Sequence, residues 1–139
     1  MNLLENYIQE INNDPQIKIK FLHKYDVMVT PGNDNEWKLK LKMIEKLYGA
    51  ITSRVASVLY PIFKNQCLKV ELDKSKCKIS KTEFLKNIPV KYIRFFSDDT
   101  SSGVHIIFNV GQYFENPYAR VNIDSKMNIK KADVSLEGA

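Results

Sequence analysis

The clearest pattern in the chain is the stretch 47–63, which contains a single charged side chain, Arg54. Apolar residues in and just before it recur at intervals of three and four, the spacing of one helical face. They are Leu41, Ile44, Tyr48, Ile51, Val55 and Val58. The other side carries the small residues Gly49, Ser53 and Ala56. We therefore expect a central helix over about 43–60 that is covered on both faces.

This stretch does not fit a transmembrane helix, which needs about 20 predominantly apolar residues. The stretch is shorter, has Arg54 near its middle and contains Pro61. Proline has no amide donor and disfavours helical geometry at the residue before it, so the helix should end at Leu59 or Tyr60. The stretch is therefore predicted to be the centre of a folded core.

Apolar and polar residues alternate with period two in the first third of the chain, which indicates strands. Residues 16–30 predict one long strand with an irregularity near His23 and Lys24. A turn signal at 31–35 follows, and 37–43 alternates again, with lysines between Trp37, Leu39, Leu41 and Met43. This predicts the second arm of a hairpin. A short amphipathic helix is expected over 2–13.

The second half predicts further strands and one short helix. Residues 67–73 alternate and indicate a strand. Ser80 followed by Glu83 has the form of a capping box at the start of a helix that ends before Pro89. The segments 90–96 and 104–110 predict a hairpin, and 118–124 predicts a last strand.

These elements follow one another in the order α-β-β-α-β-α-β-β-β, which leaves few places for parallel crossovers. We expect an α+β fold with a mostly antiparallel sheet of about five or six strands, packed around the long central helix with two shorter helices. The length of 139 residues fits a single domain, 1–139. The segment from about 126 to 139 is polar enough to fray or to dock on a partner.

Charge is the first feature that bears on function. The chain is basic, with a formal net charge of +5 and a pI near 9.1. Lysines gather in 67–90, at Lys69, Lys74, Lys76, Lys78, Lys81 and Lys86. A nucleic acid could bind such a strand and short helix through release of counterions. Lysine is also the ordinary solvating residue of strands and protects sheet edges, so both interpretations stay open.

The three arginines are the second candidate group, because arginine supplies a planar, bidentate donor that lysine lacks. Arg54 lies in an apolar helix and must find an acceptor or reach the surface. An ion pair with Glu71 or Asp73, a carbonyl network, an oligomer contact or an anionic ligand would each satisfy it. Arg94 and Arg120 lie in predicted strands and would either converge on the same site or be surface or paired residues.

Complete catalytic and nucleotide-binding motifs are missing from the sequence, including HExxH, GxSxG and the P-loop. His23 and His105 are interpreted as structural histidines. The order Asp26, Glu36, Lys38 matches that of PD-(D/E)xK nucleases, in which an acid pair holds a divalent metal. A polar turn precedes Glu36 where that pattern requires a buried strand. The prediction leans against an enzyme, and no cofactor or metal is expected.

Cys67 and Cys77 are outside any CxxC motif and have no histidine beside them, so free thiols are expected. A bridge between them would be expected if the protein were exported. The amino-terminal residues lack the pattern of a secretory signal, which predicts the cytoplasm of the protein's own cell or of an infected host. The abundance of Lys, Ile and Asn is typical of a low-GC bacterium or its phages.

The sequence thus predicts a non-enzymatic protein-interaction module: an inhibitor, immunity protein, adaptor or accessory subunit. It would bind a protein partner or itself through a sheet edge or face, with homo-oligomerisation as one form. One alternative is a nucleic-acid-binding protein that uses the lysine-rich strand and short helix. The other is the PD-(D/E)xK-like metal-dependent nuclease.

Overall fold

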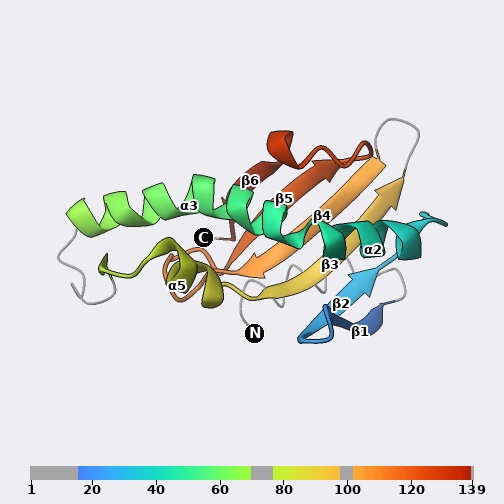
Figure 1. Cartoon of the computed structure of the whole chain (residues 1–139), viewed down its shortest axis with the longest axis horizontal. Helices are drawn as coiled ribbons and strands as arrows, with labels where there is room; N and C mark the ends of the chain where they lie inside the picture. Colours follow the sequence, from blue (N-terminus) through green and yellow to red (C-terminus); the bar gives the residue numbers. More distant parts are fainter. Residues whose placement is uncertain (1–15, 70–76, 98–101, 139) are drawn as a thin grey trace.

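A computed structural model describes residues 16–69, 77–97 and 102–138 of the chain (Figure 1). Its elements are β1 (Ile17–Phe21), β2 (Tyr25–Thr30), α2 (Trp37–Lys46), α3 (Tyr48–Lys69), α5 (Lys81–Lys86), β3 (Val90–Ser97), β4 (Ser102–Asn109), β5 (Tyr118–Asp124), the 3-10 helix η1 (Ile129–Lys131) and β6 (Asp133–Glu137). The helix expected over 2–13 lies outside the described residues.

The sheet has six strands in the order β1-β2-β3-β4-β5-β6. Neighbouring strands are antiparallel except β2 and β3, which pair in parallel because the chain passes through α2, α3 and α5 between them. Figure 1 shows these three helices on one face of the sheet. The predicted α+β fold, with a mostly antiparallel sheet and one long helix, is confirmed.

The predicted long strand over 16–30 is a hairpin of β1 and β2, and its irregularity is the turn between them. Leu22 and His23 both have positive φ, 55° and 57°, and the Lys24 amide donates to the Phe21 carbonyl at 3.1 Å. Two positive φ angles are typical of a type I′ turn, which usually contains Asn or Gly. The Glu45 carboxylate accepts from the Leu22 amide at 2.8 Å and ties the turn to α2.

We expect His23→Gly to stabilise the protein, by up to about 1 kcal/mol, because glycine adopts positive φ without the steric cost that other residues incur. The matched control is Lys24→Gly, in the same turn but outside the positive-φ residues, which should destabilise. Urea unfolding followed by circular dichroism measures both. Equal effects of the two substitutions would contradict the turn geometry.

Residues 37–43 form the helix α2 and not a strand, so that prediction is wrong. Asp34 holds the chain just before the helix: its carboxylate accepts from the Glu36 amide at 2.8 Å and from Lys40 Nζ at 2.5 Å. Ile44 is then buried, whereas Leu39 and Met43 on the opposite side keep 62% and 39% of their surface exposed. Of the alternating residues, Trp37 and Leu41 pack against the core, whereas Leu39 and Met43 face solvent, as the spacing of a helix requires.

The prediction that the central helix ends before Pro61 is wrong, because the helix continues as α3 to Lys69. The helix also breaks at Leu47, so 43–60 spans parts of α2 and α3. Pro61 and Ser57 are both exposed, so the helix loses the hydrogen bond to the Ser57 carbonyl on its solvent side. Continuation places Phe63 in the core at 2% exposure, which offsets one lost hydrogen bond. In the described part of the chain, no helix is long and apolar enough to cross a bilayer.

Only one side of α3 is fully covered. Gly49 and Ser53 are exposed, and a Cβ added at Gly49 would meet no atom within 4 Å. The prediction that both faces are covered is therefore wrong for these two residues, although Ala56 is buried. The small side of the helix faces solvent because the sheet lies on the opposite side.

The strand predicted over 67–73 is also wrong where it can be judged, since residues 67–69 belong to α3. The remainder, 70–76, lies outside the described residues. Cys67 and Cys77 form a disulfide with a Cα–Cα distance of 5.8 Å, so the prediction of free thiols is wrong. The bridge joins the end of α3 to the chain that leads into α5.

The capping box was predicted correctly in its main contact, because the Glu83 amide donates to Ser80 Oγ at 3.2 Å at the start of α5. The hairpin of 90–96 and 104–110 and the strand at 118–124 correspond to β3, β4 and β5. The polar segment 126–139 contains η1 and β6, and β6 extends the sheet by antiparallel pairing with β5.

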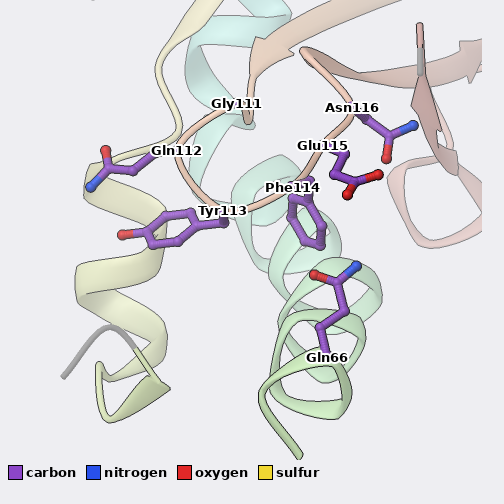
Figure 2. Close-up of a pocket in the computed structure, with 7 residues that line it drawn as sticks. All are labelled: Gln66, Gly111, Gln112, Tyr113, Phe114, Glu115 and Asn116. Carbon is purple, nitrogen blue, oxygen red and sulfur yellow. The ribbon is translucent and has the colours of Figure 1, made fainter. Parts of the chain in front are cut away.

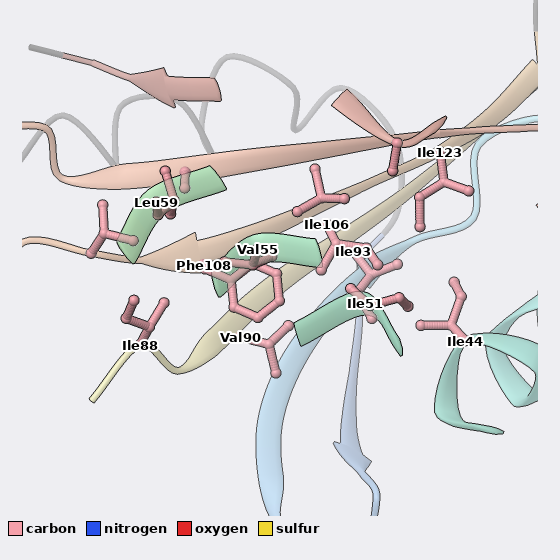
Figure 3. Packing of buried hydrophobic residues seen from close by; sticks show 14 of the residues in the cluster. Ile44, Ile51, Val55, Leu59, Ile88, Val90, Ile93, Ile106, Phe108 and Ile123 are labelled. Carbon is pink, nitrogen blue, oxygen red and sulfur yellow. The ribbon is translucent and has the colours of Figure 1, made fainter. Parts of the chain in front are cut away.

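The core lies between α3 and the sheet (Figure 3). Ile51, Val55 and Leu59 from α3 are fully buried against strand residues such as Ile93 and Ile106. At the far end of α3, an aromatic cluster joins the helices to the loop after β4. It comprises Tyr60, Phe63, Phe84, Tyr113 and Phe114. This core fixes the strands whose opposite faces form the candidate site.

Candidate anion-binding site

Alternation along the strands divides the sheet into a face toward α3 and an opposite face, which we call the back face. Ile93 and Phe95 of β3 belong to the core under α3, so Tyr92, Arg94 and Phe96 lie on the back face. The same alternation places His105 of β4 there. Arg120 of β5, between core residues Ala119 and Val121, completes this row of polar side chains.

Strand register brings two predicted arginines together around a histidine. Arg94 is the direct cross-strand partner of His105, and Arg120 is the partner of Ile107, two residues from His105 on the same face. Directly opposite side chains are in contact range, and diagonal neighbours remain within reach of a long side chain. The back face thus carries one cluster of Arg94, His105 and Arg120.

The cluster holds more positive than negative charge. Arg120 forms an ion pair with Glu137 at 3.0 Å, and Ser135 Oγ donates to the same carboxylate at 2.9 Å. Among the described residues, Arg94 forms no ion pair. Arg94 and Arg120 are both half-buried. The one carboxylate of the cluster therefore pairs with Arg120, and Arg94 can take another anion.

His105 is the unusual member, because its Nδ1 atom is buried and has no hydrogen-bond partner among the described residues. Its ring lies against Phe96, with centroids 4.7 Å apart. Burial, together with the smaller effects of the Arg120 and Arg94 charges, lowers the pKa of His105 from 6.5 to about 4, although the charge of Glu137 opposes this shift. The imidazole is therefore neutral at pH 7.

Protonation of His105 is linked to stability. Because the folded pKa is about 4 and the ordinary value is 6.5, the unfolded chain binds more protons between these values. The contribution of His105 to stability is therefore present above pH 6.5 and is lost as the pH falls toward 4. An anion placed beside the ring would favour the charged form and reduce this loss.

An apolar row supports the cluster on the same face. Tyr92, Ile107 and Tyr118 form a buried group with Met28 packed against it. The Thr30 hydroxyl hydrogen-bonds to the Tyr92 hydroxyl, which also accepts from the Gln16 amide at 3.4 Å. Because these side chains are buried, they hold in place the parts of β3 and β4 that carry Arg94 and His105.

Arg54 does not join the other two arginines. It lies in α3, on the opposite side of the sheet, where its Nε donates to the Ala132 carbonyl at 3.0 Å. This bond is the carbonyl contact that the sequence offered as one solution. It ties α3 to the chain before β6. Ser53, Ser57, Ile129 and Lys130 surround Arg54 in a shallow groove.

The predicted lysine surface is only partly described. Lys78, Lys81 and Lys86 are exposed in and before α5, and α5 lies on the α3 side of the sheet (Figure 1). Lys74 and Lys76 lie outside the described residues. The predicted strand 67–73, which would carry Lys69, is helical at this residue. The structure therefore separates these lysines from Arg94 and Arg120.

Another hollow lies between the loop 111–116 and the end of α3 (Figure 2). It has a volume of about 520 Å³ and is lined by Gln66, Gly111, Gln112, Tyr113, Phe114, Glu115 and Asn116. Figure 2 shows Phe114 and Gln66 approaching each other from the loop and from α3. The Asn87 amide holds the Tyr113 hydroxyl at 2.8 Å. In the described part, the buried polar atom that lacks a partner is at His105 and not here.

The residues of the nuclease-like pattern have other positions. Asp26 pairs with Lys20 at 2.7 Å, and the hydrogen bond and charge of Lys20 lower the Asp26 pKa. Glu36 lies at the start of α2 and Lys38 within it, so neither is on a strand. Among the described residues, no three His, Cys, Asp or Glu side chains are grouped to hold a metal ion.

Comparison with known proteins gave no matching family model, no matching curated protein and no matching solved structure. The site is therefore interpreted from its own geometry.

Sequence reasoning selected Arg94 and Arg120 by residue type but missed His105. Period-two spacing alone places His105 on the back face, because its neighbours Val104 and Ile106 point into the core. What it does not give is the register that makes Arg94 its partner. The hollow at 111–116 was also missed, because its lining comes from a loop and a helix extension.

Proposed function

We propose that the protein is a non-enzymatic interaction module that binds an anionic group of a partner protein at Arg94, His105 and Arg120 on the back face. The observation that carries this proposal is the buried His105 Nδ1, which has no hydrogen-bond partner among the described residues. It lies beside Arg94, which forms no ion pair in the same part of the chain. An inhibitor, immunity protein, adaptor or accessory subunit would use such a face in the same way.

A bound carboxylate or phosphate would supply what the cluster lacks. The Arg94 guanidinium can donate two parallel hydrogen bonds to either group. Protonated His105 would add a donor from Nδ1, which removes the cost of leaving a buried polar atom unsatisfied. Glu137 keeps Arg120 in position through its ion pair. Because Glu137, the one carboxylate of the cluster, is paired with Arg120, we propose that the site binds the anion and catalyses no reaction.

Calorimetric titration with sodium sulfate and with sodium acetate tests the proposal and separates oxyanion from carboxylate recognition. We expect Arg94→Gln to weaken binding of the preferred anion by about tenfold or more, since a charge-assisted pair is lost. The control is Lys91→Gln, which removes an exposed charge from the same strand. Binding that is unchanged in Arg94→Gln but lost in Lys91→Gln would overturn the proposal.

Nucleic-acid binding remains the alternative, and the same protein distinguishes it. A short DNA oligonucleotide should bind through Lys81 and Lys86, which are exposed on α5, with affinity that falls steeply as salt rises. If the Lys81→Gln/Lys86→Gln variant loses oligonucleotide affinity while Arg94→Gln keeps it, the lysine surface and not the back face carries the function.

The compartment is a separate proposal. The sequence predicts the cytoplasm, whereas the Cys67–Cys77 disulfide favours a compartment where disulfides persist. We therefore propose an oxidising compartment for the protein and for its partner. A bacterial or phage source also stays a prediction, because it rests on composition alone.

A further inference from the structure

The sheet is open and ends in two strands with unlike charges. In the described part of the chain, no strand pairs with the outer side of β1 or of β6. Such edges present free backbone donors and acceptors to other chains. On the back face, β1 carries Lys18 and Lys20, whereas β6 carries Asp133 and Glu137. One edge is therefore basic and the other acidic.

The two edges match in direction and in face. The pairings along the sheet make β1 and β6 run in the same direction. A second copy in the same orientation would therefore place its β1 parallel to β6, with α3 of both copies on the same side. Alternation then sets the lysines of β1 beside the acids of β6. On the other face, Ile17 and Ile19 would meet Val134 and Leu136.

We propose that β6 of one copy pairs with β1 of a second copy of this chain. Pairing of β1 with β1 would oppose lysines, and pairing of β6 with β6 would oppose acids, so like edges repel each other. Lys20 and Glu137 already have partners, Asp26 and Arg120. Lys18 and Asp133 form no ion pair among the described residues and are the charges that a second copy would use.

The contact also covers apolar surface. Ile17 keeps 37% of its surface exposed at the basic edge, and Val134 and Leu136 are half-buried at the acidic edge. Because the two surfaces differ, the contact is head-to-tail and continues as an open chain or closes as a ring. The contact shares Glu137 with the anion site, but Lys18 and Asp133, its charges without an ion pair among the described residues, lie outside that site, and it goes beyond the function proposed there.

Charge reversal at the two edges tests the inference by light scattering and sedimentation over a range of protein concentrations at low salt. The unmodified protein should form concentration-dependent oligomers. Lys18→Glu and Asp133→Lys should each weaken association by about tenfold, because each creates a like-charge contact. The double variant, Lys18→Glu with Asp133→Lys, should associate again, since both charges are exchanged. An equimolar mixture of the single variants should do the same.

Lys46→Glu is the control for Lys18→Glu, because it makes the same charge change on an exposed position of α2. Circular dichroism and sulfate titration of every variant verify folding and the anion site independently of assembly. An unmodified protein that stays monomeric, single variants that assemble as it does, or a folded double variant that does not recover would each overturn the inference.

Discussion

Phe63→Ala is expected to lower the free energy of unfolding by about 3–5 kcal/mol, the usual loss for a large buried aromatic side chain. Phe63 is 2% exposed, and its ring lies 5.4 Å from that of Phe84 and 5.0 Å from that of Tyr113. Removal of the ring leaves a cavity among the side chains that join α3, α5 and the loop after β4. A domain of this size has total stability of about 5–15 kcal/mol, so the variant should be close to unfolding.

Chemical unfolding followed by circular dichroism measures this loss, and Ile62→Ala is the control. Ile62 precedes Phe63 in α3 but keeps 38% of its surface exposed, so its truncation should have a much smaller effect. The comparison tests the continuation of α3 through Pro61. If the helix ended before Pro61, Phe63 would not be held against Phe84, and the two substitutions would have similar effects.

Replacement of both Cys67 and Cys77 by serine is expected to lower the free energy of unfolding by about 2–3 kcal/mol, from loop-closure entropy alone. The bridge spans a sequence separation of 10 residues, and its loss gives the unfolded chain more conformations. Unfolding of the oxidised protein, of the protein in reductant and of the double serine variant measures the effect. The last two should agree.

Alkylation followed by mass measurement gives the independent control for the disulfide. Without reductant, the denatured protein should take up no iodoacetamide, and after reduction it should take up two equivalents. Alkylation of both cysteines without reductant, together with unchanged stability of the serine variant, would restore the prediction of free thiols.

Local sequence rules predicted the carboxyl-terminal half of the sheet well. β3, β4 and β5 are runs rich in β-branched and aromatic residues separated by turn signals, so their existence and approximate bounds could be predicted directly from the sequence. The Ser80–Glu83 contact is equally local and could be predicted from the helix start. These elements depend on neighbours in the sequence, which is why a single chain is enough to find them.

Rules of the same kind failed where a local signal competed with tertiary packing. Residues 37–43 alternate as a strand would, but they form a helix, and Asp34 just before it accepts hydrogen bonds from the Glu36 amide and from Lys40. Pro61 should end a helix, yet burial of Phe63 beyond it keeps α3 continuous. In both cases the decision depends on contacts with other parts of the fold.

The candidate site was predictable in its residue types but not in its geometry. Arg94 and Arg120 stood out because arginine is rare in this lysine-rich chain. Their approach to His105 depends on the registers of β3 with β4 and of β4 with β5. Arg54 was grouped with them for the same reason of type, but it bonds to Ala132 on the other side of the sheet.

The pKa of His105, measured by NMR with and without sulfate, is the sharpest test of anion binding on the back face. We predict a value of about 4 in the free protein and a clear upward shift with sulfate, because a nearby anion favours the charged imidazole. Since the anion raises this pKa, sulfate should also bind more tightly as the pH falls. His23, exposed at the β1–β2 turn, reports the general effect of salt. Sulfate binding that leaves the His105 pKa unchanged, or shifts it only as much as that of His23, would show that the anion does not bind beside His105.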